Sequence, residues 1–202
     1  MKHVALGFRA HSGWTALVAI TLEQGIPRVL LREHPHLVKT FTYEFRQPYH
    51  TARKGSLDEA RDFISRVRSE ARGLAWQAIS SAQLNLQGQG YELKRCGLLL
   101  SSGKPLPDIP QILASHALIH TADGELFREA LLHACERCGL GTFKAPESGL
   151  LERASQALQQ KGDELGCCLA HLGAAVGSPW TQDEKLAALV AWLSLSVPTC
   201  KS

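Results

Sequence analysis

HVALGFRAHSGWTALVAITLEQGIPRVLL, residues 3–31, contains three apolar runs separated by two turns. The runs lie at 3–8, 14–22 and 28–31. They are rich in aliphatic and β-branched residues, which favours strands. Ala-His-Ser-Gly at 10–13 and Gln-Gly-Ile-Pro at 24–27 have the composition of turns. Because short turns join neighbouring antiparallel strands, this stretch predicts a three-stranded meander.

A long amphipathic helix is predicted downstream of the meander. Ser56 and Glu59 have the spacing of a capping box, in which a hydroxyl and a carboxylate satisfy backbone donors at a helix start. Apolar residues then recur at helical spacing from 57 to 82, for about seven turns. Gly88 and Gly90 end this helix.

The second half of the chain alternates strands with helices. The wholly apolar run 96–100 is typical of a central strand covered on both faces. The later expected elements are a helix from about 109 to 121, a break at Asp123-Gly124, a helix at 125–137, a strand at 142–144, helices at 148–160 and 163–175, and a last helix that opens at Thr181 with a second capping box to Glu184. This order predicts an α/β fold with a five-stranded mixed sheet, three antiparallel strands and then two parallel additions, flanked by helices.

Length and composition are typical of one globular unit. With 202 residues, 45% of them hydrophobic, we expect a single domain over 1–202. The formal charge of +3 permits an anionic partner without requiring one. No apolar run is long enough for a membrane span or has the form of a signal peptide, so we expect a cytoplasmic protein. The six cysteines, which include a CxxC pair at Cys135 and Cys138, are interpreted as free thiols.

The order of elements resembles the ribonuclease H-like fold, and its Holliday-junction resolvase branch most closely, over about residues 3–195. The resemblance implies acidic residues on the first strand, at the end of the fourth strand and at the start of the last helix, which together hold two metal ions. The first position falls near Arg9 in VALGFRAHSG, and the second near Ser101 in LLLSSG. Only the third, with Asp183 and Glu184 in TQDEKLAAL, is acidic. The resemblance therefore implies a pseudoenzyme that has lost the nuclease centre.

The same topology predicts a binding site for an anion. If strands one and four are adjacent, one sheet edge gathers a cationic and hydroxylic set with two histidines on its wall. Its members are Arg9, His11, Ser101, Ser102, Lys104, His116, His120 and Asp183. Such a set suits phosphate or carboxylate. The alternative is that these are ordinary strand-end and turn residues, since the longer glycine pattern of a phosphate-binding loop is missing.

His116 and His120 deserve a second interpretation because they lie four residues apart on one helical face. That spacing can place two imidazoles on one zinc ion. Position 117 is not Glu, so the metalloprotease helix signature is absent, and third ligands such as His11 or Asp183 follow from topology alone. We assign no metal ligand and no cofactor from the sequence. A polar pocket and packed or solvated histidines remain the alternatives.

Residues 39–54, KTFTYEFRQPYHTARK, form the basic and aromatic part of an irregular insertion at 35–55. Aromatic faces that stack on bases, beside cations that meet phosphates, are typical of single-stranded nucleic acid binding. The candidate contacts are Lys39, Tyr43, Arg46, Tyr49, Arg53 and Lys54. The alternative is a short strand over 40–45 that buries its alternating aromatic residues.

Three functions therefore remain open. The first is a non-catalytic or divergent ribonuclease H-like protein that binds nucleic acid or another phosphate-containing ligand. The second is a hydrolase or transferase that uses His11, His116 or His120 with Ser101 or Ser102, with one zinc ion as an option. The third is a protein-interaction module, such as a homodimer.

Overall fold

The computed structural model describes residues 1–101 and 105–196. Five strands form one sheet: β1 (Lys2–His11), β2 (Trp14–Glu23), β3 (Ile26–Glu33), β4 (Tyr91–Leu100) and β5 (Gly141–Pro146). Their order is β3-β2-β1-β4-β5. β1 to β3 pair antiparallel, whereas β4 pairs parallel with β1 and with β5. The predicted α/β fold with a five-stranded mixed sheet is confirmed.

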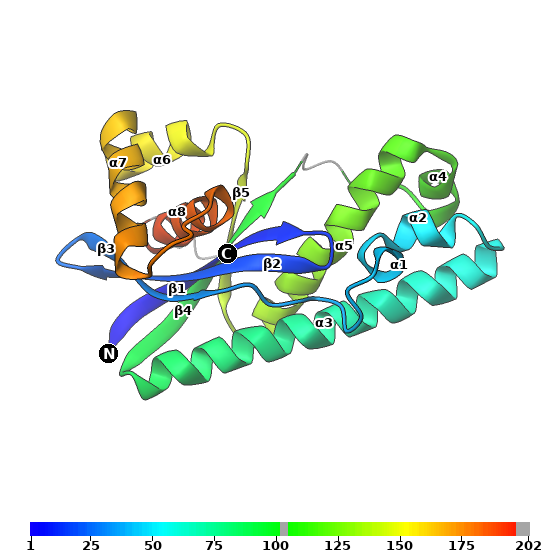
Figure 1. The fold of residues 1–202 in the computed structure, drawn as a ribbon, viewed down its shortest axis with the longest axis horizontal. Helices are drawn as coiled ribbons and strands as arrows, with labels where there is room; N and C mark the ends of the chain where they lie inside the picture. The colour runs from blue at the N-terminus through cyan, green and yellow to red at the C-terminus, as the bar shows by residue number, and fades with distance from the viewer. Residues whose placement is uncertain (102–104, 197–202) are drawn as a thin grey trace.

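Helices cover both faces of the sheet (Figure 1). They are α1 (Tyr43–Arg46), α2 (Pro48–Ala52), α3 (Leu57–Gly88), α4 (Ile109–Ala114), α5 (His116–Arg137), α6 (Leu150–Leu158), α7 (Gly162–Leu172) and α8 (Gln182–Ser196), with a 3-10 turn at Gly173–Ala175. One core lies between the sheet and α3 and α5, and a second between the sheet and α6 to α8. Within the described ranges, no helix has the length and apolarity that crossing a membrane requires.

The last helix lies unusually close to the sheet because two strand residues lack side chains. A Cβ atom on Gly7 of β1 would overlap the carbonyl oxygen of Ala187, and one on Gly97 of β4 would overlap that of Val190. The backbone of α8 therefore rests directly on the two central strands. This contact carries Asp183, in the first turn of α8, to the carboxyl end of β1.

Two local predictions are wrong. The expected strand over 40–45 is replaced by the helical turn α1, in which Tyr43 stays exposed. The expected helix break at Asp123-Gly124 is also absent, because α5 runs through both residues and the break falls at Ser115, which caps α5. Asp123 is 3% exposed, and its carboxylate accepts hydrogen bonds from α2. A tertiary contact thus overrides the local turn preference of Asp-Gly.

Candidate functional site

Arg9 lies between two carboxylates at the carboxyl end of β1. Its Nη2 and Nε atoms donate to the two carboxylate oxygens of Glu147, over 2.7 and 3.2 Å. Its Nη1 atom donates to Asp183. Glu147 directly follows β5, and Asp183 lies at the start of α8, so three elements meet here. We call Arg9, His11, Glu147 and Asp183 the edge centre.

The charges of the edge centre are already partly balanced within the chain. The hydrogen bond from Arg9 to Glu147 raises the pKa of the guanidinium, which therefore stays charged. His11 stacks on Trp14 with a centroid distance of 4.4 Å, and its Nε2 atom is 3.3 Å from Asp183 Oδ1. Burial lowers the pKa of His11, which favours the neutral ring. One fixed cation is thus shared by two carboxylates.

Ser101 is directed to α5. Its Oγ atom donates to Glu125 Oε1 over 2.6 Å, and Arg128 Nη1 donates to the same oxygen over 3.0 Å. Ser102 and Lys104, the other predicted members of this turn, lie outside the described residues. The structure therefore brings Arg9, His11 and Asp183 together and places Ser101 in a separate hydrogen-bond group.

His116 and His120 belong to a second cluster, which includes none of the edge-centre residues. Their Nε2 atoms are 3.1 Å apart in the first turns of α5, and the ring of His50 on α2 lies 4.4 Å from the ring of His120. The ligand nitrogens of all three residues lie within 4.8 Å of one another. We call His50, His116 and His120 the histidine cluster. His11 and Asp183, which topology had suggested as third ligands, contact each other and Arg9 instead.

Asp123 supports the histidine cluster from behind. Its Oδ2 atom is 2.5 Å from His50 Nδ1, and its Oδ1 atom accepts the backbone N–H of Tyr49 over 2.7 Å. Burial raises the pKa of Asp123, and these hydrogen bonds oppose the rise. A carboxylate at this distance suits the His50 tautomer with its proton on Nδ1, in which Nε2 carries the lone pair.

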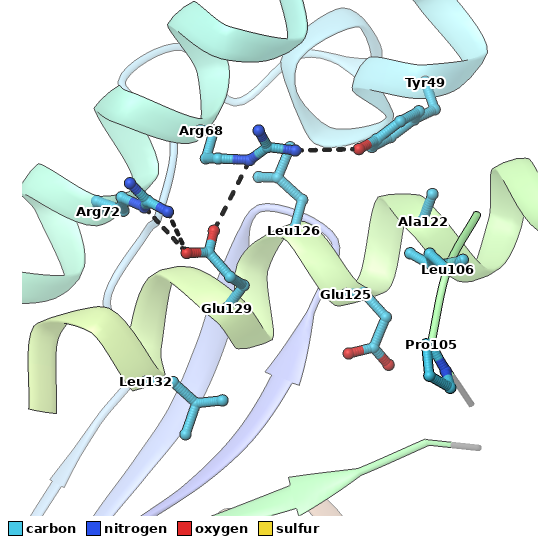
Figure 2. A pocket seen from close by; sticks show the side chains of 10 residues that line it. All are labelled: Tyr49, Arg68, Arg72, Pro105, Leu106, Ala122, Glu125, Leu126, Glu129 and Leu132. Carbon is cyan, nitrogen blue, oxygen red and sulfur yellow. Dashed lines mark hydrogen bonds and ion pairs between the residues drawn. The ribbon is translucent and has the colours of Figure 1, made fainter. Parts of the chain in front are cut away.

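A pocket of about 490 Å³ opens between α2, α3 and α5 (Figure 2). Glu129 accepts from Arg72 Nε over 3.0 Å and lies 3.8 Å from Arg68 Nε. Arg68 also donates to the phenol oxygen of Tyr49 over 3.2 Å, and burial raises the pKa of that phenol. Since Glu125 adds a second carboxylate, acidic and basic side chains balance in this pocket. A ligand here would have to compete with existing ion pairs.

The basic and aromatic segment divides into anchored and exposed side chains. Lys39 pairs with Glu70, and Tyr49 is 4% exposed, so its ring cannot stack on a base. Arg46 donates to the carbonyl of Ser12 and covers the ring of Phe41. The remaining candidates, Tyr43, Arg53 and Lys54, are exposed. Arg53 and Lys54 have no ion-pair partner within 1–101 and 105–196.

Three important residues were not singled out as site residues from the sequence. Glu147 immediately follows the fifth strand, and the rule that parallel strands end at a common edge could have identified it. His50 and Asp123 had no comparable signal, because nothing in the spacing of positions 50, 116, 120 and 123 indicates that α2 packs against α5.

No known family model matches the sequence, and no curated protein matches it. Solved structures do match. The T. thermophilus RuvC structure in complex with Holliday junction substrate has a TM-score of 0.53 and 11% identity, covering 95% of this chain and 91% of that chain. A second Thermus thermophilus RuvC structure has a TM-score of 0.51 and 11% identity, covering 94% and 92%. This likeness shows the fold: the chain has the ribonuclease H-like fold.

Proposed function

We propose that this protein binds nucleic acid through a ribonuclease H-like fold that has no two-metal nuclease centre. The observation that carries the proposal is the position of Arg9, whose guanidinium pairs with both Glu147 and Asp183. The chain's own cation thus lies where the carboxylate that follows β5 and the carboxylate of α8 converge.

Two-metal catalysis requires a different charge balance. Paired divalent ions a few ångström apart need several carboxylates around them. Here two carboxylates share one permanent positive charge, and His11 contributes a neutral ring. A divalent ion at this place would be repelled by the guanidinium and would have to break its hydrogen bonds. The charge balance at the edge centre therefore favours a structural role for these residues over metal binding.

The exposed part of the segment 39–54 supports nucleic acid as the ligand. Tyr43 is 58% exposed and can stack on a base. Arg53 and Lys54 directly follow α2 and are exposed cations without an ion-pair partner among the described residues. An anion at Arg9 would have to displace a carboxylate. Phosphates therefore meet less competition at Arg53 and Lys54. The RuvC structure bound to a Holliday junction makes a four-way junction a suitable probe.

Fluorescence anisotropy with labelled single strands, duplex and four-way junctions in EDTA tests the proposal. The combined variant Tyr43→Ala, Arg53→Ala, Lys54→Ala should weaken binding to unrelated sequences. Each lost phosphate contact should also reduce the salt slope by about 0.7 for single strands or about 0.9 for duplex.

A control matched in charge removes two positive charges elsewhere. Lys94 and Lys161 are exposed and lie outside the segment 39–54. Replacing both with Ala should leave the affinity within about twofold and thus separate a local surface from net charge. Failure of the wild type to bind any of the three probes would disprove the proposal. Equal losses in the two combined variants would place the contact elsewhere.

A further inference from the structure

The histidine cluster adjoins the proposed nucleic acid contact, since the rings of His50 and Tyr43 meet edge-on with a centroid distance of 6.3 Å, and its own geometry is that of a metal-binding site. His50 comes from α2, and His116 and His120 come from successive turns of α5. Their ligand nitrogens lie within 4.8 Å of one another. The exposed rings of His116 and His120 leave one side of the cluster open to solvent.

We propose that His50, His116 and His120 bind one divalent transition-metal ion, with Zn²⁺ as the best fit. A tetrahedral zinc ion with Zn–N distances of about 2.0–2.1 Å separates its nitrogen ligands by about 3.4 Å. The 3.1 Å between the Nε2 atoms of His116 and His120 is close to this separation. Small rotations of the exposed rings can bring all three nitrogens to a common ion.

Asp123 gives this cluster a feature that packed surface histidines do not require. Metal-bound imidazoles usually donate their second ring N–H to a carboxylate or carbonyl, which fixes the ring and strengthens the ligand. The 2.5 Å contact from His50 Nδ1 to Asp123 is such an arrangement, and Asp123 is itself fixed by the backbone of Tyr49. Of the three rings, His50 is therefore positioned before any ion arrives.

The type of ligand atom decides which ions fit the cluster, because all three ligands are imidazole nitrogens. Neutral imidazole is the form that binds Zn²⁺, Co²⁺ or Ni²⁺, whereas Mg²⁺ prefers oxygen ligands. With three protein ligands, the fourth position stays open for water or another small ligand.

Equilibrium dialysis with Zn²⁺, and absorption spectroscopy with Co²⁺, test the site in the full chain. We expect one ion per chain and the visible bands of tetrahedral Co²⁺. His116→Ala and His120→Ala remove exposed rings and should each reduce affinity at least tenfold, while His133→Ala, on the same helix but outside the cluster, should not. Asp123→Asn keeps all three ligands and should weaken binding by about 10- to 100-fold.

The outcomes are distinct. No bound Zn²⁺ at micromolar concentrations in the wild type, or equal affinities in His116→Ala, His120→Ala and His133→Ala, would overturn the proposal. If Asp123→Asn unfolds, the two exposed-histidine variants still decide the result. The proposed nucleic acid contact is measured in EDTA, so the two proposals can fail separately.

Discussion

The edge centre and the histidine cluster show two ways in which ligand-forming side chains are balanced in one fold. At the edge centre, Glu147 and Asp183 converge on Arg9, which belongs to the chain and cannot dissociate. At the histidine cluster, three ring nitrogens converge, and Asp123 behind them is the carboxylate that contacts a ring. The first site already contains its cation, whereas the second has lone pairs suited to one.

Whether a cation of the chain already lies among the converging side chains distinguishes a structural site from a ligand-binding site better than the types of those side chains do. Two carboxylates that converge beside the end of the central strand β1 suggest a metal centre until the guanidinium of Arg9 is seen. Histidines on a surface helix suggest solvated residues until the buried Asp123 is seen. At the edge centre the decisive residue, Arg9, comes from β1, and at the histidine cluster Asp123 of α5 contacts the ring that α2 contributes. The following predictions test this comparison, starting with the largest expected effect.

Gly7→Ala should break the edge centre by displacing α8. The added Cβ meets the backbone of Ala187, which cannot move without shifting the helix that carries Asp183. Overpacking of this kind costs about 1–3 kcal/mol or more, and we expect the upper end in urea unfolding. Gly73→Ala is the matched control because nothing lies within 4 Å of its added Cβ in α3. It should be neutral or stabilising by up to about 1 kcal/mol. Equal effects would refute the close packing of α8.

Arg9→Ala should destabilise the protein by about 2 kcal/mol, because it leaves Glu147 and Asp183 facing each other without a cation. The value is below that of a fully buried pair, since water reaches both carboxylates. Arg61→Ala removes an exposed pair with Asp58 and should change stability by less than about 0.5 kcal/mol. Urea unfolding of both variants measures the difference. An equal, small loss would show that Arg9 does not hold this edge together.

Arg9→Asp should convert the edge centre into a site that needs an external cation. Three carboxylates would then converge, and Mg²⁺ should raise the melting temperature of the variant while leaving that of the wild type unchanged. A ligand present at a hundred times its dissociation constant stabilises by about 2.7 kcal/mol. Arg61→Asp controls for the change in net charge. A wild type that responds to Mg²⁺ as strongly as the variant would contradict the role given to Arg9.

Substitution of His11 should have the smallest effect, a change in how the free energy of unfolding depends on pH. Burial lowers its pKa in the folded protein, so the unfolded chain binds more protons between the folded value and about 6.5. The stability that depends on a neutral His11 is therefore fully present above the unfolded pKa. It is lost as the pH falls through the lowered pKa of the folded protein. His11→Phe keeps an aromatic ring against Trp14 and should flatten unfolding free energy between pH 5 and 7.5. Parallel curves for variant and wild type would rule this out.

Much of the fold could be predicted from the sequence, because local pattern and global topology agree. The meander, the capped helix α3 and the capping box at Thr181 and Glu184 all follow from spacing. Parallel pairing of β1 with β4 follows from the order of elements. The local predictions were wrong for residues 40–45 and for Asp123-Gly124. The conformation of both depends on contacts with distant residues.

The candidate sites were less accessible to sequence analysis for the same reason. Topology brought Arg9 and Asp183 to one edge, but the second carboxylate, Glu147, depends on where β5 ends. Residue spacing paired His116 with His120, but their partner His50 lies in a segment with no clear periodicity. Contacts that arise because α2 packs against α5 cannot be predicted from the spacing of residues in the sequence.

The most direct test of the central claim is a cleavage assay on the wild-type protein. Four-way DNA junctions and RNA–DNA hybrids are incubated with Mg²⁺ or Mn²⁺, with Asp183→Asn prepared in parallel. Because Arg9 pairs with both Glu147 and Asp183, we predict no cleavage above that of the Asp183→Asn control. Metal-dependent cleavage that Asp183→Asn abolishes would contradict the account and show that the edge centre is an active nuclease site.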